Sequence, residues 1–339
     1  MNRQLTPKHI FQCRSQLKNT IRNFFQRQEY EEVDTPIVVP CPGTEIHLNY
    51  FSTQWQDYKG SSHRLWLRSS PELHMKQVLA MGLDKIFQLA PSFRNHGELG
   101  KWHSPEFLML EWYEVGITFA DLIQQTIELL RKTQMEFYTV FPIYKGGVKL
   151  PRDFPTFSIQ EAFSKFASLD LIDQDPHLAR KAKAAGVISV NADDGFETAF
   201  FKILLEKIEP AIKLLEAAVL YDYPPSQAAL AKIENGVAKR FEIYIQGVEL
   251  CNGFWEQLDA AENRSRIAAS NCLRRQQERE VCLEDEYFYQ ALSQGIPSAC
   301  GNALGFDRWL ALLMNCDSLS CTNPFFGQKP FSQDNFLGS

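Results

Sequence analysis

The chain has 339 residues, of which 45% are hydrophobic and 22% charged, a balance typical of a globular protein with one large or two small domains. Its formal net charge of −6 excludes a global basic field that would gather nucleic acid. The first residues contain no apolar run of the kind found in signal peptides, and no apolar stretch is long enough to span a bilayer.

The cysteines include no Cys-x-x-Cys pair. In a chain of this length without a secretion signal we expect all of them to be reduced thiols. Cys316 and Cys321 lack a nearby third or fourth ligand, so we expect no zinc site there. Together these features predict a cytoplasmic protein.

In chain order, helical spacing of apolar residues runs from about 7 to 28, and residues 30–38 follow as an extended segment interrupted by Pro36. Strand-like stretches follow at 64–67, 86–89 and 107–113, and helical patterning covers 119–137. Ser158 and Glu161 have the spacing of a capping box at the head of another helix.

The second half begins with a helical stretch at 200–208, which we expect Pro210 to end. Strand patterning returns at 217–221 and 241–250, a helix is expected at 260–277, and a glycine-containing turn at 301–305 leads into a last helix. Strands come in groups with helices appended, which predicts an α+β fold with a mostly antiparallel sheet flanked by helices.

The expected strand 107–113 has one wholly apolar face, and its other face carries Phe107, Met109, Glu111 and Tyr113. An aromatic ring, a carboxylate and a phenol on one face are typical of a pocket lining. The alternative is an amphipathic strand whose Glu111 meets solvent.

Upstream, Arg94 precedes a glycine-containing loop and a return strand, an arrangement that suits a phosphate because arginine keeps its charge and offers a fork of donors. The alternative is an ordinary polar loop, since a phenylalanine and an arginine before such a loop are a common pair.

The segment 249–256 contains two carboxylates of opposite parity, Glu249 and Glu256. A bulge or turn at Asn252–Gly253 would bring both to one pocket, where they could share Mg²⁺ or meet an ammonium ion. The alternative is a hairpin with two exposed acids. A third cluster, 301–308, combines small residues, which let a ligand approach the backbone, with Arg308 near the start of a helix. A structural turn before a core helix has the same pattern.

These segments, in this order, resemble the class II aminoacyl-tRNA synthetases. The segment ending at 33–36 is similar to motif 1, residues 93–111 to motif 2 and residues 305–308 to motif 3. Residues 70–72, 103–107, 111–113 and 249–256 resemble the lysyl branch, and the matching spans most of residues 10 to 314.

Motif 1 begins within the first 40 residues, so the N-terminal anticodon-binding OB domain of lysyl-tRNA synthetases is expected to be absent. The chain therefore resembles their truncated paralogues, in which an alanine, here Ala303, replaces the usual glycine. The resemblance implies a ligase that uses ATP and Mg²⁺ to activate lysine or (R)-β-lysine as an adenylate. The acceptor would be a lysine side chain of elongation factor P, with no stable tRNA binding.

Carried over by position, the resemblance makes Arg94, Glu249 and Arg308 catalytic, with Phe107 and Arg308 stacking on the two faces of adenine. Glu98 or His96 would contact the adenine edge. The expected ATP contacts are Arg94, Asn95, His96, Glu98, Ser104, Phe107, Glu249, Leu250, Gly305 and Arg308.

The resemblance also implies Glu249 and Glu256 as Mg²⁺ ligands. Ser70 to Glu72 would receive the substrate's amino group, and carboxylates on the far wall would meet its ε-ammonium, since an unpaired buried ammonium is costly. The expected substrate contacts are Ser70, Pro71, Glu72, Glu111, Tyr113, Asn252, Glu256 and Ala303.

We expect residues 1–316 to form one catalytic domain, with a divergent tail at 317–339 that is either disordered or covers a dimer partner. Motif 1 implies a homodimer. The chain departs from the family at Ser104, usually asparagine, at Glu29, often glycine, and in a motif 2 loop one residue longer than expected. The competing hypotheses are a tRNA-charging enzyme and a non-catalytic synthetase-like regulator.

Overall fold

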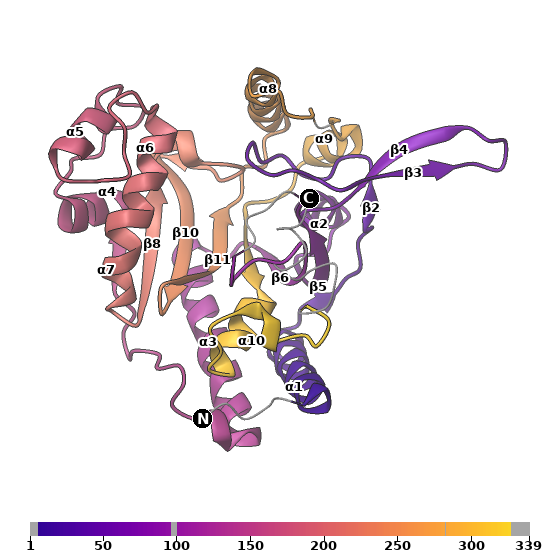
Figure 1. Cartoon of the computed structure of the whole chain (residues 1–339). Coiled ribbons are helices and arrows are strands. Elements are labelled where there is room, and N and C mark those ends of the chain that lie inside the picture. Colours follow the sequence, from indigo (N-terminus) through magenta and orange to yellow (C-terminus); the bar gives the residue numbers. More distant parts are fainter. Residues whose placement is uncertain (1–5, 96–99, 282, 327–339) are drawn as a thin grey trace, which may run out of the picture. The chain divides into compact units, whose positions relative to one another are not determined.

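The computed structural model describes residues 6–95, 100–281 and 283–326. The chain divides into two compact units, the first comprising Met1–Val148 and Leu258–Ser339 and the second comprising Lys149–Gln257. Each unit combines strands with flanking helices (Figure 1). Most strand pairs are antiparallel, which agrees with the predicted α+β class.

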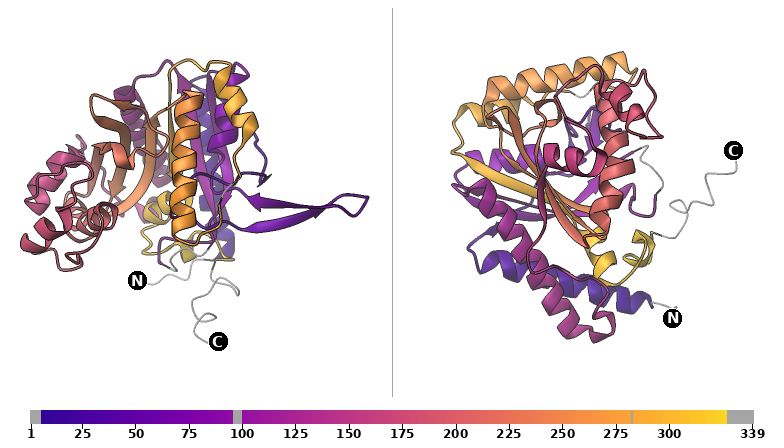
Figure 2. Two further views of the ribbon diagram at one scale, coloured as in Figure 1. Left: turned by 90° about the horizontal axis from the view of Figure 1, so that it is seen from above. Right: turned by 90° about the vertical axis from the view of Figure 1, so that its left-hand side faces the viewer.

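The main sheet of the first unit has the order β1-β5-β6-β12. Only its β1–β5 pair is parallel among the pairs described. A smaller sheet has the order β2-β4-β3, and its β3–β4 hairpin projects from the rest of this unit (Figures 1 and 2). The bounds are β1 (Glu31–Glu32), β2 (Val38–Val39), β3 (Ser52–Gln56), β4 (Ser62–Leu67), β5 (Lys85–Phe93), β6 (Glu106–Val115) and β12 (Ala299–Gly305).

The helices of the first unit start where the sequence supplies side-chain caps. Thr6, Thr118, Asp259 and Asp285 each accept a hydrogen bond from a backbone N–H in the first turn of the helix that follows. The bounds are α1 (Pro7–Gln26), α2 (Glu72–Ala80), α3 (Phe119–Val140), α8 (Ala260–Gln276), α9 (Glu286–Ser293) and α10 (Phe306–Leu313), with 3₁₀ turns at Pro142–Tyr144 and Leu319–Cys321.

Aromatic side chains join α1 to the sheet of the first unit. The ring of Phe25 stacks on Phe87 of β5 with centroids 4.8 Å apart and lies 5.4 Å from Trp112 of β6. Helices α1 and α3 lie side by side (Figures 1 and 2). After α1 the chain turns through Glu29, whose φ of +63° lies in the left-handed region that glycine adopts without strain.

The second unit contains a sheet of order β11-β10-β8-β7, with the short strand β9 paired to β10. The helices pack their apolar residues against β8 and β10, and Ser158 and Glu161 form the predicted capping box at α4. The bounds are β7 (Thr156–Ser158), α4 (Ile159–Ala162), α5 (Leu178–Ala184), α6 (Phe196–Ile203), α7 (Glu209–Lys213), β8 (Ala217–Tyr223), β9 (Ile233–Glu234), β10 (Val237–Ile245) and β11 (Val248–Trp255), with π turns at Phe163–Ala167 and Leu204–Ile208 and a 3₁₀ turn at Pro225–Gln227.

Two predicted boundaries in the second unit are wrong. Pro210 does not end the helical stretch, because it occupies the first turn of α7, where a missing N–H costs nothing. Residues 241–250 are not one strand, because Gly247 supplies a positive φ of +79° and turns the chain between β10 and β11.

The expectation that all cysteines are reduced is also wrong for one pair. Cys316 and Cys321 form a disulfide, since the chain reverses after α10 and brings their Cα atoms to 6.6 Å. Cys282 lies outside the described residues. Among the residues that are described, no helix is both long and apolar enough to cross a membrane.

Candidate functional site

Strand β6 carries the polar residues that were predicted to line a pocket. Glu111 is 1% exposed and Tyr113 is 3% exposed. The Tyr113 hydroxyl donates a 2.6 Å hydrogen bond to Oε1 of Glu111. On the other face, Leu110 and Trp112 are fully buried, as predicted for a core face. The alternative in which Glu111 meets solvent is therefore wrong, and the carboxylate belongs to a buried polar cluster.

Strand β12 places only very small residues on one face of the sheet. Residues 301–305 were expected as a turn, but they form a strand paired with β6. Its register puts Gly301 opposite Tyr113 and Ala303 opposite Glu111. Directly opposed residues share a face, so β12 adds only one methyl group and no larger side chain beside Glu111. The residues of β12 opposite Glu111 and Tyr113 are therefore small.

Two buried polar residues near Glu111 were missed from the sequence. Gln88 of β5 lies directly opposite Glu111 in the sheet and is 3% exposed. Arg68 donates to the carbonyls of Thr35 and Pro91 at 2.8 and 2.9 Å. Burial lowers the pKa of Arg68, and the nearby Glu111 carboxylate only partly offsets this. The available signal was an arginine placed directly after the apolar strand segment 65–67.

Helix α2 begins at the residues expected to receive the substrate's amino group. Ser70 and Pro71 precede the helix, and Glu72 lies in its first turn, where a carboxylate is favoured by the helix dipole. The Lys76 ammonium donates a 2.8 Å hydrogen bond to Glu72 Oε1, and the Lys76 side chain is fully buried. Glu72 is thus held by a cation from its own helix.

Arg94 follows β5 and stands beside the aromatic ring predicted to stack on adenine. Its guanidinium carbon lies 5.2 Å from the centroid of Phe107, a cation–π distance. Its backbone N–H donates to the carbonyl of Pro105 at 2.9 Å, so the two strands remain joined where the loop begins. The structure therefore brings these two predicted ATP contacts together.

The rest of the motif 2 loop is only partly described. The backbone N–H of Asn95 donates to the carbonyl of Asn49 at 2.9 Å, and Ser104 is partly buried. His96 and Glu98 lie outside the described residues, so the choice between them for the adenine edge stays a prediction.

Arg308 lies in the first turn of α10 and its donors face the end of the same loop. Its Nε donates to the carbonyl of Trp102 at 3.2 Å, and its Nη2 lies 3.1 Å from Nε2 of His103. Because arginine has no acceptor, His103 must accept through Nε2 and carry its proton on Nδ1. A Cβ at Gly305 would lie 3.3 Å from Cδ of Arg308, so this glycine leaves the arginine its path.

Asp307 was not predicted but fixes α10 in place. It is 2% exposed, it pairs with Arg14 of α1, and it accepts a 2.7 Å hydrogen bond from the backbone N–H of Leu108. One carboxylate therefore joins α1, β6 and α10, and sets Arg308 relative to the strand that carries Phe107.

In the second unit, the remaining predicted residues lie on strand β11 or, in the case of Glu256, directly after it. Its register with β10 shifts after Ile243, where two residues of β11 oppose one of β10. Leu250 is the extra residue of this β-bulge. Because the bulge resets the alternation, Glu249 shares a face with Asn252 and Glu256 rather than opposing them.

The predicted position of this irregularity is wrong. Asn252 and Gly253 pair regularly with Glu242 and Phe241, and the bulge lies at 249–251. The hairpin turn is supplied by Gly247, so Gly253 stays in the strand. Both carboxylates do reach one face, and Glu256 is 4% exposed. Seven residues of extended chain put their Cα atoms roughly 20 Å apart, so a pocket shared by both stays a prediction.

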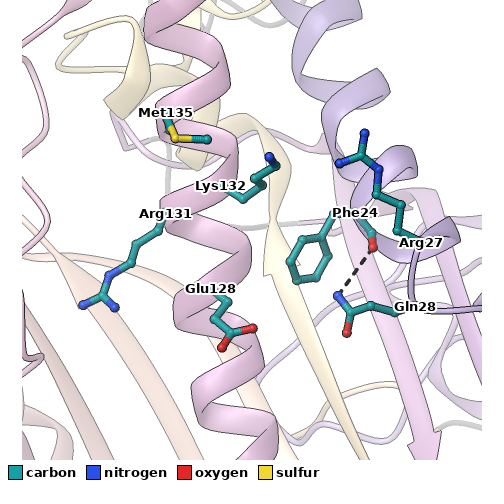
Figure 3. A pocket seen from close by; sticks show the side chains of 7 residues that line it. All are labelled: Phe24, Arg27, Gln28, Glu128, Arg131, Lys132 and Met135. Atoms are coloured by element: carbon teal, nitrogen blue, oxygen red, sulfur yellow. Dashed lines mark hydrogen bonds between the residues drawn. The ribbon is translucent and has the colours of Figure 1, made fainter.

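A cavity of about 440 Å³ lies elsewhere in the first unit, at the surface of α1 and α3 (Figure 3). It contains none of the predicted site residues. Lys132 beside it already pairs with Glu136 at 3.0 Å. The lining residues are Phe24, Arg27, Gln28, Glu128, Arg131, Lys132 and Met135.

Comparison with known proteins gives a consistent result. The family model for class II tRNA synthetases (D, K and N) matches residues 1–328. An elongation factor P–(R)-β-lysine ligase of Haemophilus influenzae (strain PittGG) is 34% identical over 315 residues, covering 91% of each chain. A ligase of the same name from Haemophilus ducreyi is 36% identical over 311 residues, which cover 90% of each chain. Another, from Histophilus somni (strain 2336), is 34% identical over 334 residues, which cover 94% of this chain and 96% of that protein. The family match spans both compact units.

Proposed function

Because the chain belongs to the class II tRNA synthetases of the D, K and N group, we propose that it is an ATP-dependent ligase acting on elongation factor P. It activates lysine or (R)-β-lysine as an aminoacyl-adenylate and transfers the acyl group to a lysine side chain of that factor. The observation that carries this proposal is the similarity to ligases of this name over nine-tenths of both chains.

The buried carboxylate of Glu111 supports recognition of a lysine-type substrate. An ammonium ion in a protein interior requires an anionic partner. Tyr113 already donates to one oxygen of Glu111, which fixes the carboxylate before substrate arrives. In this proposal Ala303, directly opposite Glu111, limits the size of the group that fits beside it.

Adenylate formation requires charge stabilisation rather than a general base. The substrate carboxylate is already ionised, and one of its oxygens attacks the α-phosphorus while the bond to pyrophosphate breaks. Arg94 and Arg308 are the residues proposed to hold the phosphates, because arginine keeps its charge and binds phosphate oxygens in pairs. In the second step the acceptor amine forms the new amide bond, loses a proton, and releases AMP.

The acidic residues of β11 suit a Mg²⁺ ion that is shared with phosphate oxygens. Glu249 and Glu256 lie on one face of the strand, and carboxylate oxygens are the ligands that Mg²⁺ prefers. Over the ranges that the structure describes, no three acidic, histidine or cysteine side chains gather as a metal cage. Glu249 would therefore hold the ion together with substrate phosphates, and Glu256 stays a predicted second ligand. When bound, Mg²⁺ would neutralise charge on these phosphates.

Several parts of the proposal go further than the family itself. These are a homodimer formed through motif 1, a cytoplasmic location, and one catalytic domain at 1–316 followed by a tail. A second candidate function is the charging of tRNA, which the name of the matching family favours. Stable aminoacylation of tRNA by this chain would support that candidate.

The direct test is ATP–pyrophosphate exchange in the presence of lysine or β-lysine, followed by mass spectrometry of elongation factor P. We expect exchange that depends on the amino acid, and a mass gain on the factor. Arg308→Ala should abolish exchange with the fold intact, whereas Arg275→Ala, an exposed arginine of α8, should not. Absence of exchange with every lysine analogue would overturn the proposal.

A further inference from the structure

A largely buried arginine on β10 supports the side chain of Asn252 from behind. Nε of Arg240 donates a 3.1 Å hydrogen bond to Oδ1 of Asn252 on the neighbouring strand. Both residues are partly buried, and the Arg240 side chain is 14% exposed. The asparagine is thus anchored at its oxygen and is not sealed from solvent.

The arginine itself is fixed by several groups of the second unit. Its Nη1 donates to the carbonyl of Gln227 at 2.9 Å, and its Nη2 pairs with the Glu242 carboxylate. Tyr244 donates a 2.7 Å hydrogen bond to the other oxygen of Glu242, and the guanidinium lies 4.4 Å from the centroid of the Tyr223 ring. These contacts hold the Arg240 guanidinium in a single position.

The charge state of this cluster is stable. Burial alone would lower the pKa of Arg240, but the Glu242 carboxylate, together with Tyr223 and Glu249, more than offsets it, so the pKa is raised. Burial, with the same carboxylate, raises the pKa of Tyr244 well above its ordinary value. The guanidinium therefore remains a pure donor at every pH at which the protein works.

A pure donor determines which way the asparagine amide points. Only Oδ1 of Asn252 can accept from Arg240, so the NH₂ group is the end that remains for a ligand. An N–H donor binds a carboxylate or carbonyl oxygen, and it cannot bind an ammonium ion. With one lone pair of Oδ1 taken by Arg240 and both N–H donors left, Asn252 fits the acyl end of the amino acid better than the wall around the ε-ammonium.

We propose that Arg240 is a positioning residue for amino-acid binding, which holds the Asn252 amide with its N–H donors directed at substrate. The proposal rests on the proposed function and adds a residue outside the segments that resemble the family motifs. Arg240 acts through Asn252 and does not itself contact substrate.

The test compares Arg240→Lys with a matched neighbour. Lysine keeps the positive charge beside Glu242, but a single ammonium cannot bond Glu242, Gln227 and Asn252 in the geometry of the fork. The control is Lys239→Gln, which removes the adjacent cation on β10, whose bonds at 3.0 and 3.2 Å go to Asp222. Pyrophosphate exchange gives KM for the amino acid and for ATP separately.

We expect Arg240→Lys to raise KM for the amino acid roughly tenfold, the weight of one hydrogen bond to a charged group, with KM for ATP changed less than about twofold. In an Asn252→Ala background the same change should have almost no further effect, because the two residues act as one unit. The inference is overturned if the increases in KM for the amino acid multiply in the double variant. It is also overturned if Arg240→Lys and Lys239→Gln change the two KM values alike.

A second variant leaves Arg240 and its buried partners unchanged. Asn252→Asp keeps an oxygen for Arg240 but replaces the NH₂ donors with an acceptor, so we expect it to raise KM for the amino acid at least as much as Asn252→Ala does. An unchanged KM would overturn the proposal even if Arg240→Lys fails to fold. Lack of exchange by the unmodified protein would instead refute the proposed function, so the two failures are distinguishable.

Discussion

The substitution Asp307→Asn tests whether one carboxylate joins α1, β6 and α10. The Asp307 side chain is 3% exposed and its partner Arg14 is 13% exposed, so solvent screens the pair little. Breaking a buried ion pair costs about 3–5 kcal/mol. Asparagine can still accept from the Leu108 N–H, and Arg14 keeps a 3.0 Å bond to the carbonyl of Thr322. We therefore expect the lower end, about 3 kcal/mol.

The matched control is Asp317→Asn. Asp317 pairs with Lys101 at 3.1 Å, but their side chains are 85% and 67% exposed, so solvent screens the pair and its loss should leave stability almost unchanged. Chemical denaturation should show the loss in the free energy of unfolding. Thermal denaturation should show the Tm of Asp307→Asn lowered by roughly 6–12 °C, because each kcal/mol shifts the Tm of a unit of this size by about 2–4 °C. If the two variants unfold alike, the ion pair does not stabilise the unit and the reasoning is wrong.

Three further predictions concern single positions. Ala303→Val should raise KM for the amino acid, since the added methyl groups enter the space beside Glu111; an unchanged KM would contradict this placement. Hydrogen bonds from the N–H groups of Ser189 and Ile188 lower the pKa of Glu206 to about 2. The ionised carboxylate therefore stabilises the fold fully above its unfolded pKa of about 4.3. This stabilisation is lost as the pH falls toward 2. Glu206→Gln should thus melt below the unmodified protein at pH 7, with a gap that narrows below about pH 4.5; a gap independent of pH would argue against it. Glu29→Gly should increase the free energy of unfolding by about 0.5–1 kcal/mol in chemical denaturation, because glycine adopts positive φ without strain, and a loss of stability would show that its side chain makes a compensating contact.

Features that depend on neighbours in the sequence were predicted well. The capping box at Ser158 is complete within four residues, and the buried face of β6 follows from alternation through Leu110 and Trp112. The resemblance to class II synthetases of the lysyl branch is likewise confirmed, because several short segments in a fixed order carry it.

Features that depend on strand pairing could not be read from the sequence in the same way. Whether a bulge falls at Leu250 or at Gly253 is decided by which residue of β10 opposes each residue of β11. Ala303 stands opposite Glu111 only because β12 pairs with β6 in one register, although almost 200 residues separate them. The disulfide of Cys316 likewise depends on how the chain reverses after α10.

The two candidate substrates differ in only one part of the molecule, which limits the residues that can distinguish between them. Lysine and (R)-β-lysine have carbon chains of equal length, with a carboxylate at one end and the same terminal ammonium at the other. Groups that hold only these ends, as proposed for Asn252 and Glu111, bind both isomers alike. Selection must therefore come from residues near the second and third carbons, where the remaining amino group differs. Among the proposed contacts this points to Glu72, which is held by Lys76 and is proposed to receive that amino group.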